Sequence, residues 1–317
     1  MPRLHHSDPT GPGIRRLGTS RLRYLDADGR TVTDKQLLDR IAALVIPPAW
    51  TDVWISPDEF GHIQALGTDQ AGRRQYIYHD AWRARRDRVK FDRAILLAQS
   101  LPAARRSVSR DLAGSDFGRS RACAAAFRII DRSSLRIGNE QYLRSNGSRG
   151  LTTLLCQHVT ITAADALFTF PSKSGQEWRS VVTDATLVRF LGAIQAARGP
   201  RSRLLSWRDP RWHSLTTALV NDDIRERTGG ELTAKDFRTL RGTIAAATSL
   251  ASRDGGEHDA DAAITRAIEH TADALGNTRA VAKASYIDPR IFDRYRAGQV
   301  LNTRLSPESA LLRLLES

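Results

Sequence analysis

The spacing of apolar residues along the chain changes near residue 82. Before it, short apolar stretches alternate with turn residues such as Pro57 and Gly61. Such stretches are typical of β-strands, and we predict strands at residues 22–25, 31–32, 53–55, 62–65 and 75–78. An amphipathic pattern over residues 34–44, followed by two prolines, predicts one short helix. The first part of the chain is therefore predicted to be a small β-rich domain.

Beyond residue 82 the apolar residues recur every three or four positions, which is the period of an amphipathic helix. Helices are predicted at residues 91–99, 119–130, 187–197, 213–227, 235–250 and 262–274. One island keeps a strand-like pattern, at 159–161, 166–170 and 178–182, and predicts a small β-meander. We therefore predict an α+β fold with a disordered tail at 1–18, a β-rich domain at 19–85 and a larger, mainly helical domain at 86–317.

The chain is strongly basic. Its 48 Lys and Arg residues exceed its 35 Asp and Glu residues, which gives a net charge of +13 and a pI of about 10.6. A protein with this charge is expected to bind a polyanion, either nucleic acid or an anionic membrane. No apolar run approaches the roughly 20 residues of a membrane span, and the N-terminus lacks the apolar core of a signal peptide. We therefore expect a cytoplasmic protein with no membrane partner.

The sequence offers no pattern for a metal or a cofactor. Cys123 and Cys156 each lie in an apolar segment and belong to no CxxC pair, so we expect buried, reduced thiols. Neither a Cys/His cluster with zinc-like spacing nor a Walker-type loop stands out. We therefore expect no metal and no cofactor.

The C-terminal part of the chain holds residue types suited to phosphodiester chemistry. Arg238 follows a capping-box-like pattern at Thr233 and Asp236, which places it in the first turns of a helix, where the helix dipole favours an anion. Tyr286 lies nine residues after Asn277. A phenol is a poor nucleophile at neutral pH, and nearby guanidinium charge would favour its phenolate form. Taken alone, Arg238 is more typical of a solvated surface arginine, and Tyr286 of a core or interface tyrosine.

Two further cations precede this region. Arg136 comes directly after a long apolar helix and before Gly138, which permits a backbone bend. Its side chain either extends to solvent or faces a ligand. Lys173 lies between two predicted strands. It is either an ordinary exposed loop lysine or a group that reaches into a groove and protonates a leaving oxygen.

Together these motifs resemble the small type IB DNA topoisomerases of poxviruses and bacteria. The resemblance extends from about residue 18 to residue 299, and several independent motifs occur in the expected order. The motifs are residues 46–54 (IPPAWTDVW), 75–78 (QYIY), 136–140 (RIGNE), 150–154 (GLTTL), 173–175 (KSG), 235–239 (KDFRT) and 285–289 (SYIDP).

The resemblance implies a role for each matching residue. Tyr286 matches the nucleophile that forms a 3′-phosphotyrosyl bond, and Arg136 and Arg238 match two arginines that clamp phosphate oxygens. Lys173 matches the general acid for the 5′-hydroxyl leaving group, and Lys235 matches an auxiliary lysine. Asn277 lies where poxvirus members have histidine. Because an amide donates hydrogen bonds but does not titrate, we expect Asn277 to act as an oxyanion donor.

The same resemblance implies a C-shaped clamp around double-stranded DNA, formed by a monomer associated with the bacterial nucleoid. We expect DNA contacts from Gln75, Tyr76, Tyr78, Tyr142 and Ser174. Because Tyr76 and Tyr78 lie two residues apart on a predicted strand, they are expected to share one face. The predicted activity is relaxation of supercoiled DNA without ATP or metal, through single-strand cleavage and religation.

Two alternatives remain from the sequence. A tyrosine recombinase uses a related set of arginine, lysine and tyrosine residues, although the β-rich N-terminal domain argues against it. A non-catalytic DNA-binding protein is supported equally well by charge alone, and it predicts salt-dependent binding without a covalent adduct.

Overall fold

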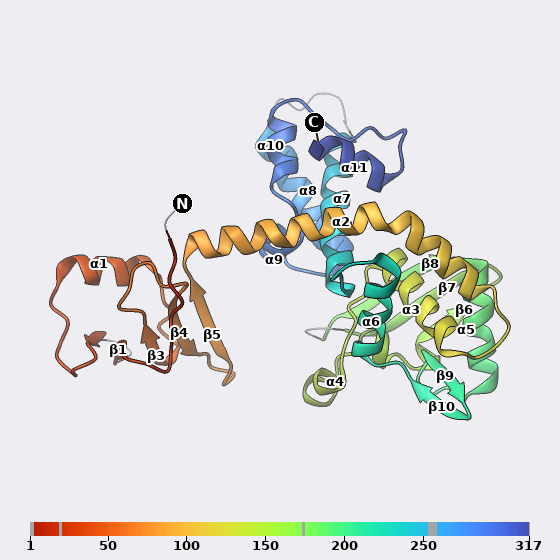
Figure 1. Ribbon diagram of the computed structural model, residues 1–317, viewed down its shortest axis with the longest axis horizontal. Coiled ribbons are helices and arrows are strands. Elements are labelled where there is room, and N and C mark those ends of the chain that lie inside the picture. The colour runs from red at the N-terminus through yellow and green to blue at the C-terminus, as the bar shows by residue number, and fades with distance from the viewer. Residues whose placement is uncertain (1–2, 19–20, 173–174, 253–258, 317) are drawn as a thin grey trace. The chain divides into compact units, whose positions relative to one another are not determined.

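A computed structural model of the chain describes residues 3–18, 21–172, 175–252 and 259–316 (Figure 1). The chain divides into two compact units, Met1–Val89 and Lys90–Ser317. The predicted division after residue 85 lies close to this boundary, which falls within helix α2 (Asp80–Leu112).

A five-stranded antiparallel sheet forms the first unit, in the order β2-β1-β3-β4-β5. Its strands are β1 (Ile14–Leu17), β2 (Arg23–Leu25), β3 (Thr51–Ile55), β4 (Ile63–Thr68) and β5 (Arg74–Tyr78). Helix α1 (Lys35–Ala43) begins at Asp34, whose carboxylate accepts hydrogen bonds from two backbone amides of the first turn. Ile41 of this helix packs into the small core with residues such as Ile14, Val53 and Ile55.

The N-terminal segment departs from the predicted disorder. The prediction of a disordered tail at 1–18 is wrong for strand β1, which lies between β2 and β3 in the sheet. Ile14 is buried in the core, and Arg16 donates hydrogen bonds to the carbonyls of Pro47 and Trp50. Gly13 lets the chain pass against the ring of Trp54, because a Cβ there would lie 2.0 Å from its indole nitrogen. A polar, Gly- and Pro-rich composition does not reveal a strand that is stabilised by distant partners.

The second unit is mainly helical, so the α+β fold class is confirmed. Helix α7 packs against α8, α9 and α11 (Figure 1). The helices are α3 (Arg119–Ser133), α4 (Glu140–Asn146), α5 (Ala185–Ala197), α6 (Thr217–Thr228), α7 (Ala234–Ala251), α8 (Ala260–Leu275), α9 (Arg279–Tyr286), α10 (Arg290–Arg296) and α11 (Pro307–Glu316). Strands β6 (Val159–Ile161), β7 (Asp165–Pro171) and β8 (Glu177–Thr183) form the predicted meander, and β9 (Ser206–Asp209) pairs with β10 (Arg211–Ser214).

Two predicted helices differ in extent. Helix α2 continues through Pro102, because buried apolar positions such as Leu97, Leu101 and Val108 keep the helical period beyond the proline. The helix predicted at 213–227 begins at Thr217 instead. His213 belongs to β10, where its ring stacks on Trp207 with centroids 4.5 Å apart.

Both cysteines are buried and free, as predicted. Burial is the main cause that raises the pKa of the Cys123 thiol to about 12. Among the described helices, none is long and apolar enough to cross a membrane.

Candidate active site

Helix α7 begins with the predicted cap and brings Arg238 to the site. The Thr233 backbone amide donates to the Asp236 carboxylate at 2.7 Å, and Arg93 of α2 forms an ion pair with the same carboxylate at 2.8 Å. These contacts fix the first turn of α7. Arg238 is the fifth residue of α7 and lies inside the protein, with only 3% of its surface exposed.

The Arg238 guanidinium is held by backbone carbonyls. Its two terminal nitrogens donate to the carbonyl oxygens of Ser134 at 2.7 Å and Leu275 at 2.8 Å. Its Nε is buried and has no hydrogen-bond partner within the described residues. Burial lowers the pKa of Arg238, an effect that the nearby Tyr286 opposes. The interpretation of Arg238 as a solvated surface arginine is therefore wrong.

Arg136 approaches the site from the segment after α3. That helix ends at Ser134, which has a left-handed backbone with φ 55°, and the predicted bend occurs at Gly138 with φ 70°. One terminal nitrogen of Arg136 donates to the Gly276 carbonyl at 2.8 Å and to Asn277 Oδ1 at 2.6 Å. Burial, followed by the neighbouring charge of Arg238, lowers the pKa of Arg136.

Asn277 lies in the turn between α8 and α9, directly after Gly276, whose φ is 56°. Because its Oδ1 accepts from Arg136, the amide orientation leaves Nδ2 as a donor. This Nδ2 is buried and finds no acceptor in the described part of the chain. Asn277 therefore presents a free N–H group beside two guanidinium groups.

Tyr286 is the last residue of α9 and is half-buried. The guanidinium carbon of Arg238 lies 4.9 Å from the centroid of its ring. Burial alone would raise the pKa of Tyr286, but Arg238, with smaller contributions from Arg136 and the exposed Lys235, lowers it below its ordinary value. The site therefore stabilises the phenolate, the form that attacks an electrophile.

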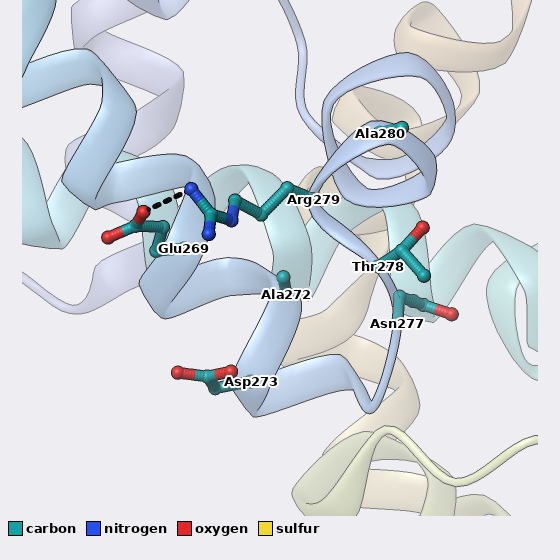
Figure 2. Close-up of a pocket in the computed structure, with 7 residues that line it drawn as sticks. All are labelled: Glu269, Ala272, Asp273, Asn277, Thr278, Arg279 and Ala280. Carbon is teal, nitrogen blue, oxygen red and sulfur yellow. Dashed lines mark ion pairs between the residues drawn. The ribbon is translucent and has the colours of Figure 1, made fainter.

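The turn that carries Asn277 also lines an open pocket. Its other lining residues are Glu269, Ala272, Asp273, Thr278, Arg279 and Ala280. Figure 2 shows the Arg279 side chain turned toward Glu269, with which it forms an ion pair at 2.7 Å, and the Asn277 side chain pointing away from that pair. Asn277 thus lines the pocket while its Oδ1 accepts from Arg136, and the exposed Arg279–Glu269 ion pair forms another part of the pocket wall.

Two predicted residues, Lys173 and Ser174, lie outside the described residues. The strands on either side of them, β7 and β8, pair in antiparallel register. Trp178 of β8 packs against Gly276, where an added Cβ would lie 3.1 Å from the indole ring. The β7–β8 hairpin therefore lies against the turn that carries Asn277.

The predicted DNA-contacting residues fall in both units. In the second unit, Tyr142 of α4 is 49% exposed. In the first unit, the rings of Tyr76 and Tyr78 stack with centroids 6.0 Å apart, which confirms that they share one face of β5. Gln75 donates to Asp69 at 2.8 Å within the same unit.

Sequence reasoning missed Gly242 and Thr243 of α7, both of which contact the backbone of Tyr286. The available signal was a glycine inside a helical pattern, which is unfavourable unless close packing requires it.

The site as described is a set of cationic and amide donors around a phenol. In the part of the chain that the structure describes, Arg136 and Arg238 donate hydrogen bonds to carbonyl and amide oxygens rather than to carboxylates. Within the described ranges, no group of three His, Cys, Asp or Glu residues could hold a metal ion. Such a set can bind a phosphodiester, stabilise the negative charge that develops during attack, and supply the nucleophile.

Comparison with known proteins agrees with this chemistry. A family model described as the catalytic core of eukaryotic DNA topoisomerase I matches residues 79–299, and a model of the N-terminal domain of bacterial DNA topoisomerase IB matches residues 21–69. The chain is also 28% identical over 306 residues to a protein named DNA topoisomerase 1B from Acanthamoeba polyphaga mimivirus. This alignment covers 93% of the present chain and 90% of the relative. The first match contains Arg136, Arg238, Asn277 and Tyr286.

Proposed function

Because the chain belongs to the type IB DNA topoisomerases, enzymes that relax DNA, we propose that Tyr286 is the nucleophile of its strand-cleavage reaction. The observation that carries this proposal is the phenol of Tyr286 beside two guanidinium groups that, among the described residues, have no carboxylate as a hydrogen-bond partner. The tyrosine oxygen attacks the phosphorus of a backbone diester, and the bond from phosphorus to the 5′ oxygen breaks. The phenol proton is lost to solvent, and the departing 5′ oxygen gains a proton.

The charged site stabilises the transition state of this step. Arg136 and Arg238 retain N–H groups beyond those bound to carbonyls, and these donate to the non-bridging phosphate oxygens. Asn277 Nδ2 supplies a further donor, and exposed Lys235 adds positive charge. We assign the protonation of the 5′ oxygen to Lys173, on the basis of the family motif. The β7–β8 hairpin beside Asn277 supports this assignment.

Religation reverses these steps. The 5′ hydroxyl attacks the 3′-phosphotyrosyl ester, and Tyr286 leaves. Because one phosphate ester is exchanged for another, the bond energy is retained and ATP is not needed. Positioning and charge stabilisation provide most of the catalysis of such transfers.

We further propose that Gln75, Tyr76, Tyr78, Tyr142 and Ser174 contact the duplex. The basic net charge of +13 supports binding to phosphates along an extended surface. We propose that the enzyme acts as a monomer at the bacterial nucleoid. The match of residues 21–69 to a bacterial topoisomerase domain favours this function over a tyrosine recombinase.

The test compares wild type with Tyr286→Phe on supercoiled plasmid, in EDTA and without ATP, followed by detergent trapping of covalent protein–DNA. We expect wild type to relax the plasmid and form an adduct, and the variant to lose both activities while it still binds DNA. Equal relaxation by both proteins would show that Tyr286 is not the nucleophile. DNA binding by wild type without relaxation or adduct would favour the non-catalytic alternative.

A further inference from the structure

Helix α7 touches the nucleophile segment at a glycine. An ideal Cβ at Gly242 would lie 2.6 Å from the Tyr286 carbonyl oxygen and 2.9 Å from the Tyr286 Cβ. It would also lie 3.0 Å from a methyl group of Leu275. A glycine inside a helix costs about 1 kcal/mol relative to alanine. Here it permits α7 to approach the end of α9 more closely than any residue with a side chain could.

The next residue holds the same segment by hydrogen bonds. Thr243 is 2% exposed. Its hydroxyl donates to the Tyr286 carbonyl at 3.3 Å and accepts from the Asp288 backbone amide at 3.0 Å. The residue between these two, Ile287, is 1% exposed and anchored in the core. The chain leaving Tyr286 is therefore fixed on both sides of one buried residue.

Gly242 and Thr243 lie about one helical turn after Arg238, or roughly 6 Å along the axis. Arg238 extends from the same helix over the Tyr286 ring. One rigid helix therefore carries both the charge that faces the phenol and the contacts that hold the tyrosine backbone.

We propose that Gly242 and Thr243 are positioning residues that set the distance between the Tyr286 phenol and the Arg238 guanidinium. This inference rests on the proposed function, because it assumes that Tyr286 attacks DNA. A displacement of about 1 Å in a reacting group can lower a rate about 10²-fold. A methyl group at position 242 requires a displacement of similar size, because the atoms that it meets include backbone.

The test measures single-turnover cleavage of a DNA duplex by full-length protein, at saturating enzyme, together with the dissociation constant for the same duplex. Gly242→Ala is expected to slow cleavage about 10²-fold without weakening binding. Gly192→Ala is the matched control, because this glycine also lies inside a helix and a Cβ added there would lie 3.8 Å from the side chain of Ile161, which is an ordinary van der Waals contact. It is expected to cleave at the wild-type rate.

Thr243 is tested by a pair of variants. Thr243→Val removes both hydrogen bonds and is expected to slow cleavage about 10-fold. Thr243→Ser keeps the hydroxyl and is expected to restore most of the rate. This pair decides the question even if Gly242→Ala does not fold.

The pH dependence of the cleavage rate distinguishes a positioning role of these residues from a general effect on protein stability. If Tyr286 moves away from Arg238, its phenolate loses stabilisation, so the rising limb of the pH–rate profile shifts to higher pH in Gly242→Ala and Thr243→Val. The inference is overturned if both variants cleave at the wild-type rate, or if they are slower with unshifted profiles and Thr243→Ser is as slow as Thr243→Val. A wild-type enzyme that forms no adduct would instead reject the proposed function.

Discussion

Helix α7 carries two arginines, three residues apart, whose surroundings are opposite. Arg241 joins an ionic network in which it contacts Asp131 at 3.0 Å and Glu308 at 3.5 Å. Arg105 binds the same two carboxylates at 2.8 and 2.7 Å, so two cations face two anions. Arg238, by contrast, donates to two backbone carbonyls and lies over the Tyr286 ring, and it forms no ion pair with a carboxylate of the described residues.

Burial has different effects on the pKa values of the ionic network and of the candidate active site. The hydrogen bonds that Arg105 donates to Asp131 are the main cause that raises the pKa of Arg105. Burial alone would raise the pKa of Asp131, but Arg105 and Arg241 lower it below its ordinary value. In the site, burial lowers the pKa of both Arg136 and Arg238. A buried charge normally requires a partner, so the balanced network is suited to stability and the unbalanced site to an anionic ligand.

The largest expected effect is on the stability of the protein when the ionic network is disrupted. Asp131 is fully buried, and Asp131→Asn leaves two guanidinium groups with one shared carboxylate, Glu308, in place of two. We expect the free energy of unfolding to fall by about 3–5 kcal/mol, measured by urea denaturation. Asp273→Asn, at an exposed position, is the control and should change it by less than about 0.5 kcal/mol. Equal unfolding midpoints for the two variants would contradict the structural role of the network.

The next largest effect is expected when Arg238 in the site is replaced, and it concerns the rate of DNA cleavage. Arg238→Lys keeps the charge but loses the planar fork that reaches two carbonyls and, in the proposed mechanism, the phosphate. We expect single-turnover cleavage to fall about 10²–10³-fold. Arg241→Lys, on the same helix, should stay close to the wild-type rate at temperatures where it remains folded. Comparable losses in the two variants would show that both arginines act in the site.

A smaller effect is expected on pH dependence. Arg136 contributes to the lowered pKa of Tyr286, after Arg238. Removing its positive charge destabilises the phenolate, so the pKa of Tyr286 rises and less phenolate is present at neutral pH. The rising limb of the pH–rate profile should therefore move to higher pH in Arg136→Ala. An unchanged or lower midpoint would show that Arg136 does not act on the phenol through its charge.

The same contrast explains what the sequence could predict. The caps and periodic apolar positions of α7 predicted the helix, and the local motifs pointed to Arg238, Asn277 and Tyr286, which the structure brings close together. Local patterns could not distinguish Arg238 from Arg241, because the balance of charge depends on Asp131 and Glu308, which are distant in sequence. They also missed strand β1, whose partners lie in β2 and β3.

The smallest expected effect concerns an arginine near the site that is paired but exposed. Arg279 and Glu269 are 69% and 40% exposed, and their ion pair lies on the pocket wall, away from the Asn277 side chain (Figure 2). Exposed pairs contribute about 0.2–1 kcal/mol because water and salt screen them. Glu269→Gln should therefore change the urea midpoint slightly and leave the cleavage rate unchanged. A tenfold slower rate would show that the charges of this pocket act on the site through the α8–α9 turn. In that case burial would not explain why Arg136 and Arg238 act in the site and exposed arginines such as Arg279 do not.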